Sequence, residues 1–202
     1  MPSFCGIVLA AGESSRMGRD KALLPWQNGT FLEAAVRSLR PHVDLVIVVV
    51  GKNADLLRPV VYALGESVIE NPAPEQGQFS SLQIGLRETL SRGRDAAIVT
   101  LVDRPAANEA TVAALKQRFL DVDPHGIWAA VPEYDGRHGH PIVLGRRMVE
   151  ALLVAPVTST ARDVMHAHQQ EIEYLPVADP MVVANVNTPE DFERLSALET
   201  TH

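Results

Sequence analysis

Short apolar runs alternate with amphipathic segments along most of the chain. Six runs rich in β-branched and aliphatic residues predict buried strands, at Cys5–Ala10, Leu45–Val50, Ser67–Ile69, Ala96–Leu101, Trp128–Pro132 and Val182–Val186. Helical patterns predict helices at Phe31–Arg40, Ala54–Leu64, Ser80–Ser91, Glu109–Phe119, Arg146–Leu153, Ala161–Gln169 and Pro189–Leu198. Near-continuous apolar strands that alternate with helices are typical of a parallel sheet covered on both faces. The pattern therefore predicts a layered α/β fold with a mostly parallel sheet.

Small and polar residues gather where the predicted strands end. In parallel α/β sheets, ligands bind outside the carboxyl ends of the strands. The residues at these ends are Gly12, Gly51, Asn71, Asp103, Pro132 and Asn187. These positions are therefore the first candidates for a binding site.

The composition is that of one globular domain over residues 1–202. The chain is 46% hydrophobic and carries a formal net charge of −7 without a run of basic residues, which argues against nucleic acid as a partner. Cys5 is the single cysteine, so an internal disulfide is excluded. No apolar stretch reaches the ~18 residues of a membrane span, and no secretory leader pattern is found at the N-terminus. We expect a cytoplasmic protein that does not insert into membranes.

The first predicted strand runs into a turn that contains glycine and has two cations behind it. Small residues around Gly12 let the backbone approach a ligand closely, so that its N–H groups can face a base or a phosphate. Arg16 and Lys21 follow where a polyphosphate can lie. The spacing from Gly12 to Gly18 differs from that of a P-loop, and the G-x-G-x-x-G of dinucleotide-binding folds is absent. The residues predict a nucleotide-binding loop of another kind.

The string from Leu9 to Lys21, L-A-A-G-x-S-x-R-M-G-x-x-K, resembles the signature of the MobA-like nucleotidyltransferases, which include the molybdenum-cofactor nucleotidylyltransferases. The resemblance implies a Rossmann-like three-layer α/β/α domain of the nucleotide-diphospho-sugar transferase type. It also implies transfer of NMP from an NTP to a phosphorylated acceptor, with Mg²⁺ and release of pyrophosphate. By this resemblance Arg16 and Lys21 bind the triphosphate, and the base rests on Leu9, Ala10, Ala11 and Gly12.

Asp103 emerges at the carboxyl end of the strand predicted at Ala96–Leu101 and is followed by Arg104 and Pro105. A carboxylate at this place can bind Mg²⁺ carried by a triphosphate, and it can equally cap the turn before Pro105. The stretch resembles the family's L-x-D-x-P motif, whose aspartate binds the metal, and this favours the ligand role. Arg104 stands where relatives often carry a neutral polar residue, so its role is open.

A second loop of the family is matched before the helix predicted from Ser80. Ser80 and Ser81 can cap this helix or face a ligand, and from the residues alone capping is favoured. The stretch that begins at Asn71 is similar to the family's N-P-x-x-x-x-G-x-x-x-S-L-x-x-G-L segment, which closes over the base. The resemblance makes Gln76, Gly77 and Ser81 candidates for nucleotide binding.

Two further segments bear on the acceptor. Gly139-His140-Pro141 looks like the G-H-P turn of the cytidylyltransferase branch, which lies near the acceptor pocket. The segment 159–162 takes the place of that branch's G-A-R segment, with Thr160 where glycine is usual. The resemblance implies that His140 and Arg162 bind the acceptor, with Arg162 facing its phosphate. The other interpretation of Arg162 is a solvated helix position.

The segment 185–191 resembles the closing motif of the family, D/N-x-D/N-T-P-E-D. The cytidylyl branch usually carries acids at both first positions, whereas this chain has Asn185 and Asn187. Asn187 can still coordinate a cation through its carbonyl oxygen, without charge, so Asp103 and Asn187 are the candidate metal ligands. Thr188 is the expected N-cap of the last helix.

Two observations favour opposite bases. Ala11 and the G-H-P turn favour CTP over GTP, whereas the guanylyl branch is the one that tolerates asparagine at Asn187. The leading expectation is transfer of CMP to molybdopterin. The alternatives are transfer of GMP to molybdopterin, transfer of NMP to a sugar or polyol phosphate, and a non-catalytic protein that carries nucleotide or cofactor to a molybdoenzyme.

Overall fold

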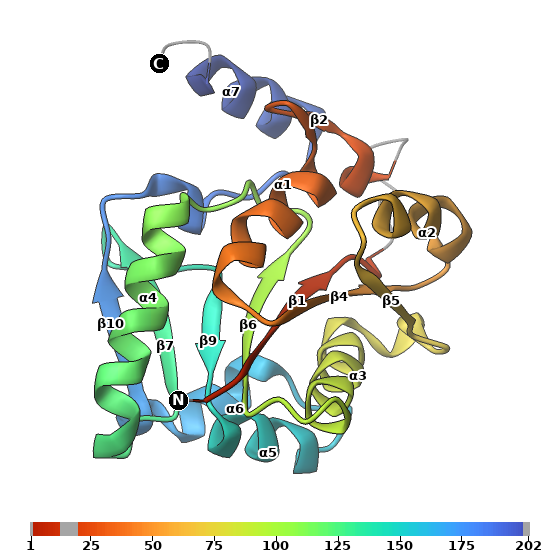
Figure 1. Ribbon diagram of the computed structural model, residues 1–202. Helices are drawn as coiled ribbons and strands as arrows, with labels where there is room; N and C mark the ends of the chain where they lie inside the picture. Colours follow the sequence, from red (N-terminus) through yellow and green to blue (C-terminus); the bar gives the residue numbers. More distant parts are fainter. Residues whose placement is uncertain (1, 13–19, 200–202) are drawn as a thin grey trace.

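A computed structural model describes residues 2–12 and 20–199, and within this part of the chain eight strands form one central sheet (Figure 1). Seven of them follow the order β10-β7-β9-β6-β1-β4-β5, and β8 pairs with β7. Their bounds are β1 (Phe4–Leu9), β4 (Leu45–Val50), β5 (Ser67–Glu70), β6 (Ala96–Leu101), β7 (Ala129–Tyr134), β8 (Arg137–His138), β9 (Ile142–Leu144) and β10 (Ile172–Pro176). β1, the first strand of the chain, lies inside the sheet between β6 and β4, so the first loop leaves the interior of the sheet.

The sheet is mostly parallel, as the alternation of strands and helices predicts. β1 pairs in parallel with β4 and β6, β4 with β5, and β7 with β10. The exceptions on this path are the pairings of β9, which is antiparallel to both β6 and β7. All six residues of β1 are buried, because this strand has a neighbour on each side and helices over both faces.

Helices cover both faces of the sheet, which gives the predicted three-layer α/β/α fold. On one face α1 (Phe31–Leu39), α2 (Ala54–Ala63) and α4 (Glu109–Val122) share a core cluster with the sheet. On the other face lie α3 (Gln78–Ser91), α5 (Arg146–Val154) and α6 (Ala161–Ala167). Alternate β1 residues divide between these layers: Val8 belongs to the first cluster, and Cys5 and Ile7 to the second. Among the described residues no helix is long and apolar enough to cross a bilayer.

A third, smaller cluster attaches the end of the chain. The hairpin β2 (Pro25–Trp26) and β3 (Gly29–Thr30) packs with α1, and α7 (Pro189–Glu199) lies against this group at the top of Figure 1. Trp26, Phe31 and Leu195 are buried in it. The predicted N-cap of α7 is confirmed, since the Asp191 amide donates to Thr188 Oγ1 at 3.2 Å.

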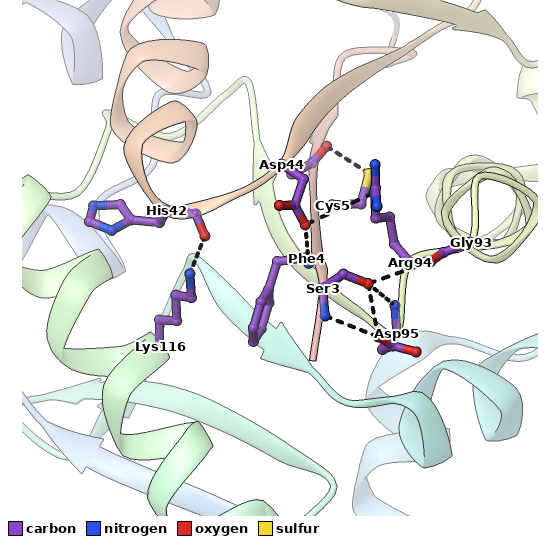
Figure 2. A network of polar contacts seen from close by, with 10 residues as sticks. Ser3, Phe4, Cys5, His42, Asp44, Gly93, Arg94, Asp95 and Lys116 are labelled. Atoms are coloured by element: carbon purple, nitrogen blue, oxygen red, sulfur yellow. Dashed lines mark hydrogen bonds and ion pairs between the residues drawn. The ribbon is translucent and has the colours of Figure 1, made fainter. Parts of the chain in front are cut away.

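Polar contacts tie the strands together at the amino edge of the sheet (Figure 2). Ser3 Oγ donates to Asp95 Oδ2 at 2.8 Å, just before β6. The Phe4 amide donates to Asp44 Oδ2 at 2.9 Å, just before β4, and Arg94 Nε lies 4.0 Å from the same oxygen. β1, β4 and β6 therefore start level with one another, so their carboxyl ends meet at one edge.

The strand predicted at Val182–Val186 is wrong. Pro180–Val183 forms a 3-10 turn, η6, and the last strand of the sheet is β10, which the prediction missed. Val182 is fully buried and Val183 is 7% exposed, because η6 packs over the end of the sheet rather than within it. A short apolar run has the same pattern in a buried turn as in a buried strand. The pattern also missed β9, a strand of three residues.

The expectation that Ser80 or Ser81 caps the helix is also wrong. α3 begins at Gln78, and its N-cap is Gly77, which has a φ of +94°. Gly77 adopts this left-handed conformation without the steric cost that a Cβ would bring. Both serine hydroxyls lie inside the first turn instead and accept hydrogen bonds from Asn71 Nδ2, each at 2.9 Å.

We expect the substitution Asp179→Ala to lower the free energy of unfolding by about 3 kcal/mol, because it removes a buried carboxylate with several partners. Asp179 is 3% exposed and accepts hydrogen bonds from the Asn108 amide, the Thr111 hydroxyl and the Met181 amide, at 2.8, 2.9 and 3.0 Å. These bonds attach η6 to the start of α4. Urea titration followed by circular dichroism measures the loss.

The matched control is Asp121→Ala, on the exposed surface of α4. Its change should stay within about 0.5 kcal/mol. Equal effects of the two substitutions would show that Asp179 does not anchor η6.

Candidate active site

A cleft of about 630 Å³ opens at the carboxyl edge of the sheet, where the strand pattern places the binding site. It is lined by Leu9, Ala11, Gly12, Lys21, Lys52, Pro74, Glu75, Gly77, Gln78, Ser81, Val102 and Asp103. Residues from the first loop, the Asp103 turn and the loop before α3 are therefore brought together, although they are far apart in the sequence.

The end of β1 forms the floor of the cleft. Beyond Leu9, the Ala10 amide still donates to the Val49 carbonyl at 2.8 Å, so the backbone stays in line with the sheet. Gly51 lies directly beside this floor: a Cβ on it would come 2.9 Å from the Ala11 carbonyl oxygen. Among the residues that the structure describes, none lies within 4 Å of the place where a Cβ on Gly12 would stand. Gly12 itself lines the cleft.

The side chain of Asn53 joins the first loop to its neighbours. Asn53 Nδ2 donates to the Ala10 carbonyl at 2.9 Å and to Asp20 Oδ2 at 2.7 Å, and its Oδ1 accepts from the Gly51 amide at 3.0 Å. Asp20 also accepts from the Ala22 amide at 2.9 Å and so caps the 3-10 turn η1 (Lys21–Leu23). This arrangement brings the chain back to the cleft at Lys21.

Lys21 and Asp103 share the cleft. Lys21 Nζ donates to Asn187 Oδ1 at 3.2 Å, and the Val186 amide donates to the Asp103 carbonyl at 2.9 Å. The segment after η6 thus passes between the two predicted site residues. Asn187 stands beside the cleft because of these contacts, and not because it ends a strand.

Asp103 carries a carboxylate oxygen that is not used by the fold. Its Oδ1 is buried and has no hydrogen-bond partner among the described residues. A buried carboxylate oxygen without a partner is costly, and this favours a ligand over the capping of a turn. The same residues include no cluster of three or more His, Cys, Asp or Glu side chains that could hold a metal ion. A cation at Asp103 would therefore need further oxygens from a bound phosphate.

The opposite wall is the loop before α3. Ser81 is 2% exposed and lines the cleft. Because Asn71 Nδ2 donates to its oxygen at 2.9 Å, the hydroxyl hydrogen of Ser81 is left to donate elsewhere. Gln76 is exposed on the short turn next to Gly77 and does not line the cleft.

The remaining predicted residues lie apart from the cleft or outside the described part of the chain. Arg16 falls within residues 13–19, which the structure does not describe. Ala10 is buried beneath the floor, 1% exposed. Arg162 is exposed on α6, and His140 is partly exposed as a residue while its ring Nδ1 is buried; neither lines the cleft. Their role in binding an acceptor stays a prediction.

Several lining residues were not predicted. The sequence pattern predicts Gly51 at a strand end. It does not single out the next residue, Lys52, as a cation of the site. Glu75 and Gln78 flank Gly77 in a loop whose motif had been recognised. Because Lys21, Lys52 and Asp103 all line it, the cleft can hold a polyphosphate together with a cation.

The sequence model of the MobA-like NTP transferase domain matches residues 6–172, which include the first loop, the Asp103 turn and all strands up to the start of β10. The chain belongs to this family. The matched part contains every residue that lines the cleft. The predicted family and the nucleotide-diphospho-sugar transferase fold are both confirmed.

The relatives of this nucleotidyltransferase include proteins named as cytidylyltransferases and proteins named as guanylyltransferases. It is 32% identical over 196 residues to a probable molybdenum cofactor guanylyltransferase of Mycobacterium avium, covering 95% of this chain and 94% of the relative. It is 24% identical over 188 residues to the molybdenum cofactor cytidylyltransferase of Escherichia coli K12, covering 92% of each chain. The chain is thus an enzyme of the nucleotidyltransferase class, as predicted.

A solved structure agrees with the fold over nearly the whole chain. The crystal structure of a protein from Mycobacterium tuberculosis H37Rv superposes with a TM-score of 0.80 at 29% identity, covering 96% of this chain and 97% of that one. That protein has also been solved as a manganese complex, with a TM-score of 0.76.

We expect the free energy of unfolding of this nucleotidyltransferase to decrease as the pH falls below 6.5, because His140 is buried in its neutral form. Burial lowers the pKa of His140 from 6.5 to about 3, and the nearby Arg104 adds to the shift. Between these values the unfolded chain binds a proton that the folded chain does not, so acid favours unfolding. The contribution approaches about 1.4 kcal/mol per pH unit. Urea titrations between neutral and mildly acid pH should therefore show that the free energy of unfolding decreases less with falling pH for His140→Gln than for the unchanged protein.

His125→Gln, at an exposed position on the 3-10 turn Asp123–His125, is the control and should keep the original slope. Parallel curves for the unchanged protein and His140→Gln would contradict a neutral, buried imidazole.

Proposed function

We propose that this nucleotidyltransferase transfers CMP from CTP to the terminal phosphate of molybdopterin and releases pyrophosphate. The observation that carries the proposal is the shared cleft, which Gly12, Lys21 and Asp103 all line. The names of the relatives supply the acceptor, because the relatives match this chain over nearly its whole length.

The triphosphate lies on the side of the cleft with Lys21 and Lys52, with Arg16 from the first loop as a further cation. These cations hold the β- and γ-phosphates while the acceptor phosphate approaches the α-phosphorus in line. No side chain of the protein has to act as a nucleophile. Its task is to orient two anions and to stabilise the charge that develops on the departing pyrophosphate.

Mg²⁺ fits the residues at Asp103. The unpartnered Oδ1 of Asp103 is a hard, negatively charged oxygen of the kind that Mg²⁺ prefers. Asn187 Oδ1 accepts from Lys21 Nζ, so its contribution is to position the lysine, and Asp103 is the ligand that we propose. When bound, Mg²⁺ would supply neutralisation of charge on the phosphates. The manganese complex of the mycobacterial neighbour supports a divalent cation in this fold.

The proposed base is cytosine, and guanine is the second candidate. Ala11 lines the cleft beside Gly51, and in this proposal its methyl group limits the room for the base. A pyrimidine needs less room than a purine, which agrees with the family resemblance at Ala11. The higher identity to a named guanylyltransferase, 32% against 24%, and the neutral Asn187 favour GMP transfer.

Pyrophosphate release with each NTP, with and without molybdopterin, tests the proposal. We expect release with CTP, molybdopterin and Mg²⁺, and a lower kcat/KM with GTP. Ala11→Gly should move the ratio of kcat/KM toward GTP by about tenfold or more, because one methyl group in a pocket discriminates by roughly this factor.

Faster release with GTP in the unchanged protein would assign the GMP reaction instead. Tight NTP binding without turnover on any acceptor would support the non-catalytic carrier.

We expect Asp103→Asn to lower kcat about 100-fold or more, because the stabilisation that a metal gives to a phosphoryl transition state is several kcal/mol. The fold should be unaffected, since Oδ1 forms no hydrogen bond and the contact with Val186 uses the backbone. Steady-state pyrophosphate release measures the loss, and a thermal melt checks the fold.

Asp121→Asn, on the surface of α4, is the control and should retain full activity. An Asp103→Asn enzyme with unchanged kcat and unchanged dependence on Mg²⁺ would remove Asp103 from the metal site.

A further inference from the structure

Two arginines, Arg104 and Arg137, contact adjacent residues of η6. Arg104 follows Asp103 in the chain, and Arg137 lies on β8. Arg104 Nη1 donates to the Val182 carbonyl at 3.5 Å, and Arg137 Nη2 donates to the Val183 carbonyl at 3.4 Å, both long for hydrogen bonds. No described carboxylate forms an ion pair with either guanidinium. Most of their five N–H donors are therefore not used by the fold.

The two cations also lie near each other. Burial lowers the pKa of Arg104, the Asp103 carboxylate opposes this shift, and the positive charge of Arg137 adds to it. Arg104 Nε is buried without a hydrogen-bond partner among the described residues, and so is Nδ1 of the neighbouring His140. Two like charges and two unsatisfied nitrogens therefore meet at one place next to the cleft.

The cost of this arrangement falls on Arg104, which is half-buried and loses hydration without gaining an ion pair with a described carboxylate. Arg137 is exposed on β8, so its guanidinium is open to a ligand. The protein as a whole is acidic, with a net charge of −7, so a local pair of unpaired arginines is not the result of an excess of basic residues. Two guanidinium groups that share a site are suited to the oxygens of a phosphate group.

We propose that Arg104 and Arg137 bind the phosphate group of the acceptor. This inference rests on the proposed nucleotidyl transfer and names the residues that hold its second substrate.

The proposed reaction needs cations at this place. The acceptor phosphate attacks as a dianion: one of its oxygens forms the new bond to the α-phosphorus, and the bond from the α-phosphorus to the bridging oxygen of pyrophosphate breaks. The electron pair of that bond leaves with pyrophosphate, and no proton is taken up or lost. The two reacting groups are both anions and repel each other. Arg104 and Arg137 offset this repulsion from the acceptor side.

The segment after Asp179 positions both arginines. Their carbonyl partners belong to η6, and the His140 amide donates to the Val182 carbonyl at 2.9 Å. Gly139 allows this approach, because a Cβ on it would collide with the Val182 carbonyl group. The G-H-P turn therefore supports the proposed phosphate site through η6, and His140 need not itself touch the acceptor.

Kinetics with molybdopterin and the preferred NTP test the proposal in the full-length protein. Arg104→Gln and Arg137→Gln should each raise the KM for the acceptor about 10- to 100-fold, the loss expected for a charge-assisted hydrogen bond, and leave the KM for the NTP within about twofold. Arg118, on α4, forms an exposed ion pair with Glu173. Arg118→Gln is the matched control and should change neither the KM for the acceptor nor the KM for the NTP. Unchanged acceptor KM in both variants, or a rise only in Arg162→Gln, would overturn the proposal.

A binding measurement separates this inference from the proposed function. Inorganic phosphate is titrated into the protein, and the side-chain Nε–Hε signals of Arg104 and Arg137, assigned through the two variants, are followed by NMR. Saturable shifts that chloride at equal ionic strength does not produce support the site, even if no acceptor is turned over. Signals that do not respond to phosphate overturn it, even if the enzyme transfers CMP or GMP.

Discussion

The side-chain amide of Asn53 is the contact on which the geometry of the cleft depends. Its two N–H donors reach the Ala10 carbonyl at the end of β1 and the carboxylate of Asp20, and its oxygen takes the Gly51 amide. The Asn53 side chain thus joins the first loop, the turn after β4 and the start of η1. Lys21 returns to the mouth of the cleft because Asp20 is held there, and Lys52 lies beside it because Gly51 is held at the same point.

A second junction sets the other half of the carboxyl edge. Asp179 attaches η6 to α4, and from η6 the backbone reaches the Asp103 carbonyl through Val186 and the Lys21 ammonium group through Asn187. The segment 179–187 therefore contacts Arg104 and Arg137 through η6, Asp103 through Val186 and Lys21 through Asn187. In the proposed reaction, one stretch of chain thus positions residues for both anionic substrates.

The agreement between sequence and structure is best where the relevant forces act over short distances along the chain. The strands at the centre of the sheet, the capping of α7 by Thr188 and the burial of Cys5 all follow from local periodicity and local hydrogen bonding. The disagreements are of another kind. Val182 is apolar because it covers the sheet, and Ser81 is polar because Asn71 donates to it, and neither partner is visible in the pattern around these residues.

The amino-acid sequence by itself determined the α/β layers, the family and the loops that line the cleft, since strand and helix periodicity and motif spacing are local properties. Only the tertiary structure decided that Asn53 joins residues 33 and 43 positions away, that η6 replaces a strand, and that Arg104 and Arg137 both contact η6. The physical reason is that such contacts depend on the packing of whole elements against one another, which no short stretch of sequence encodes.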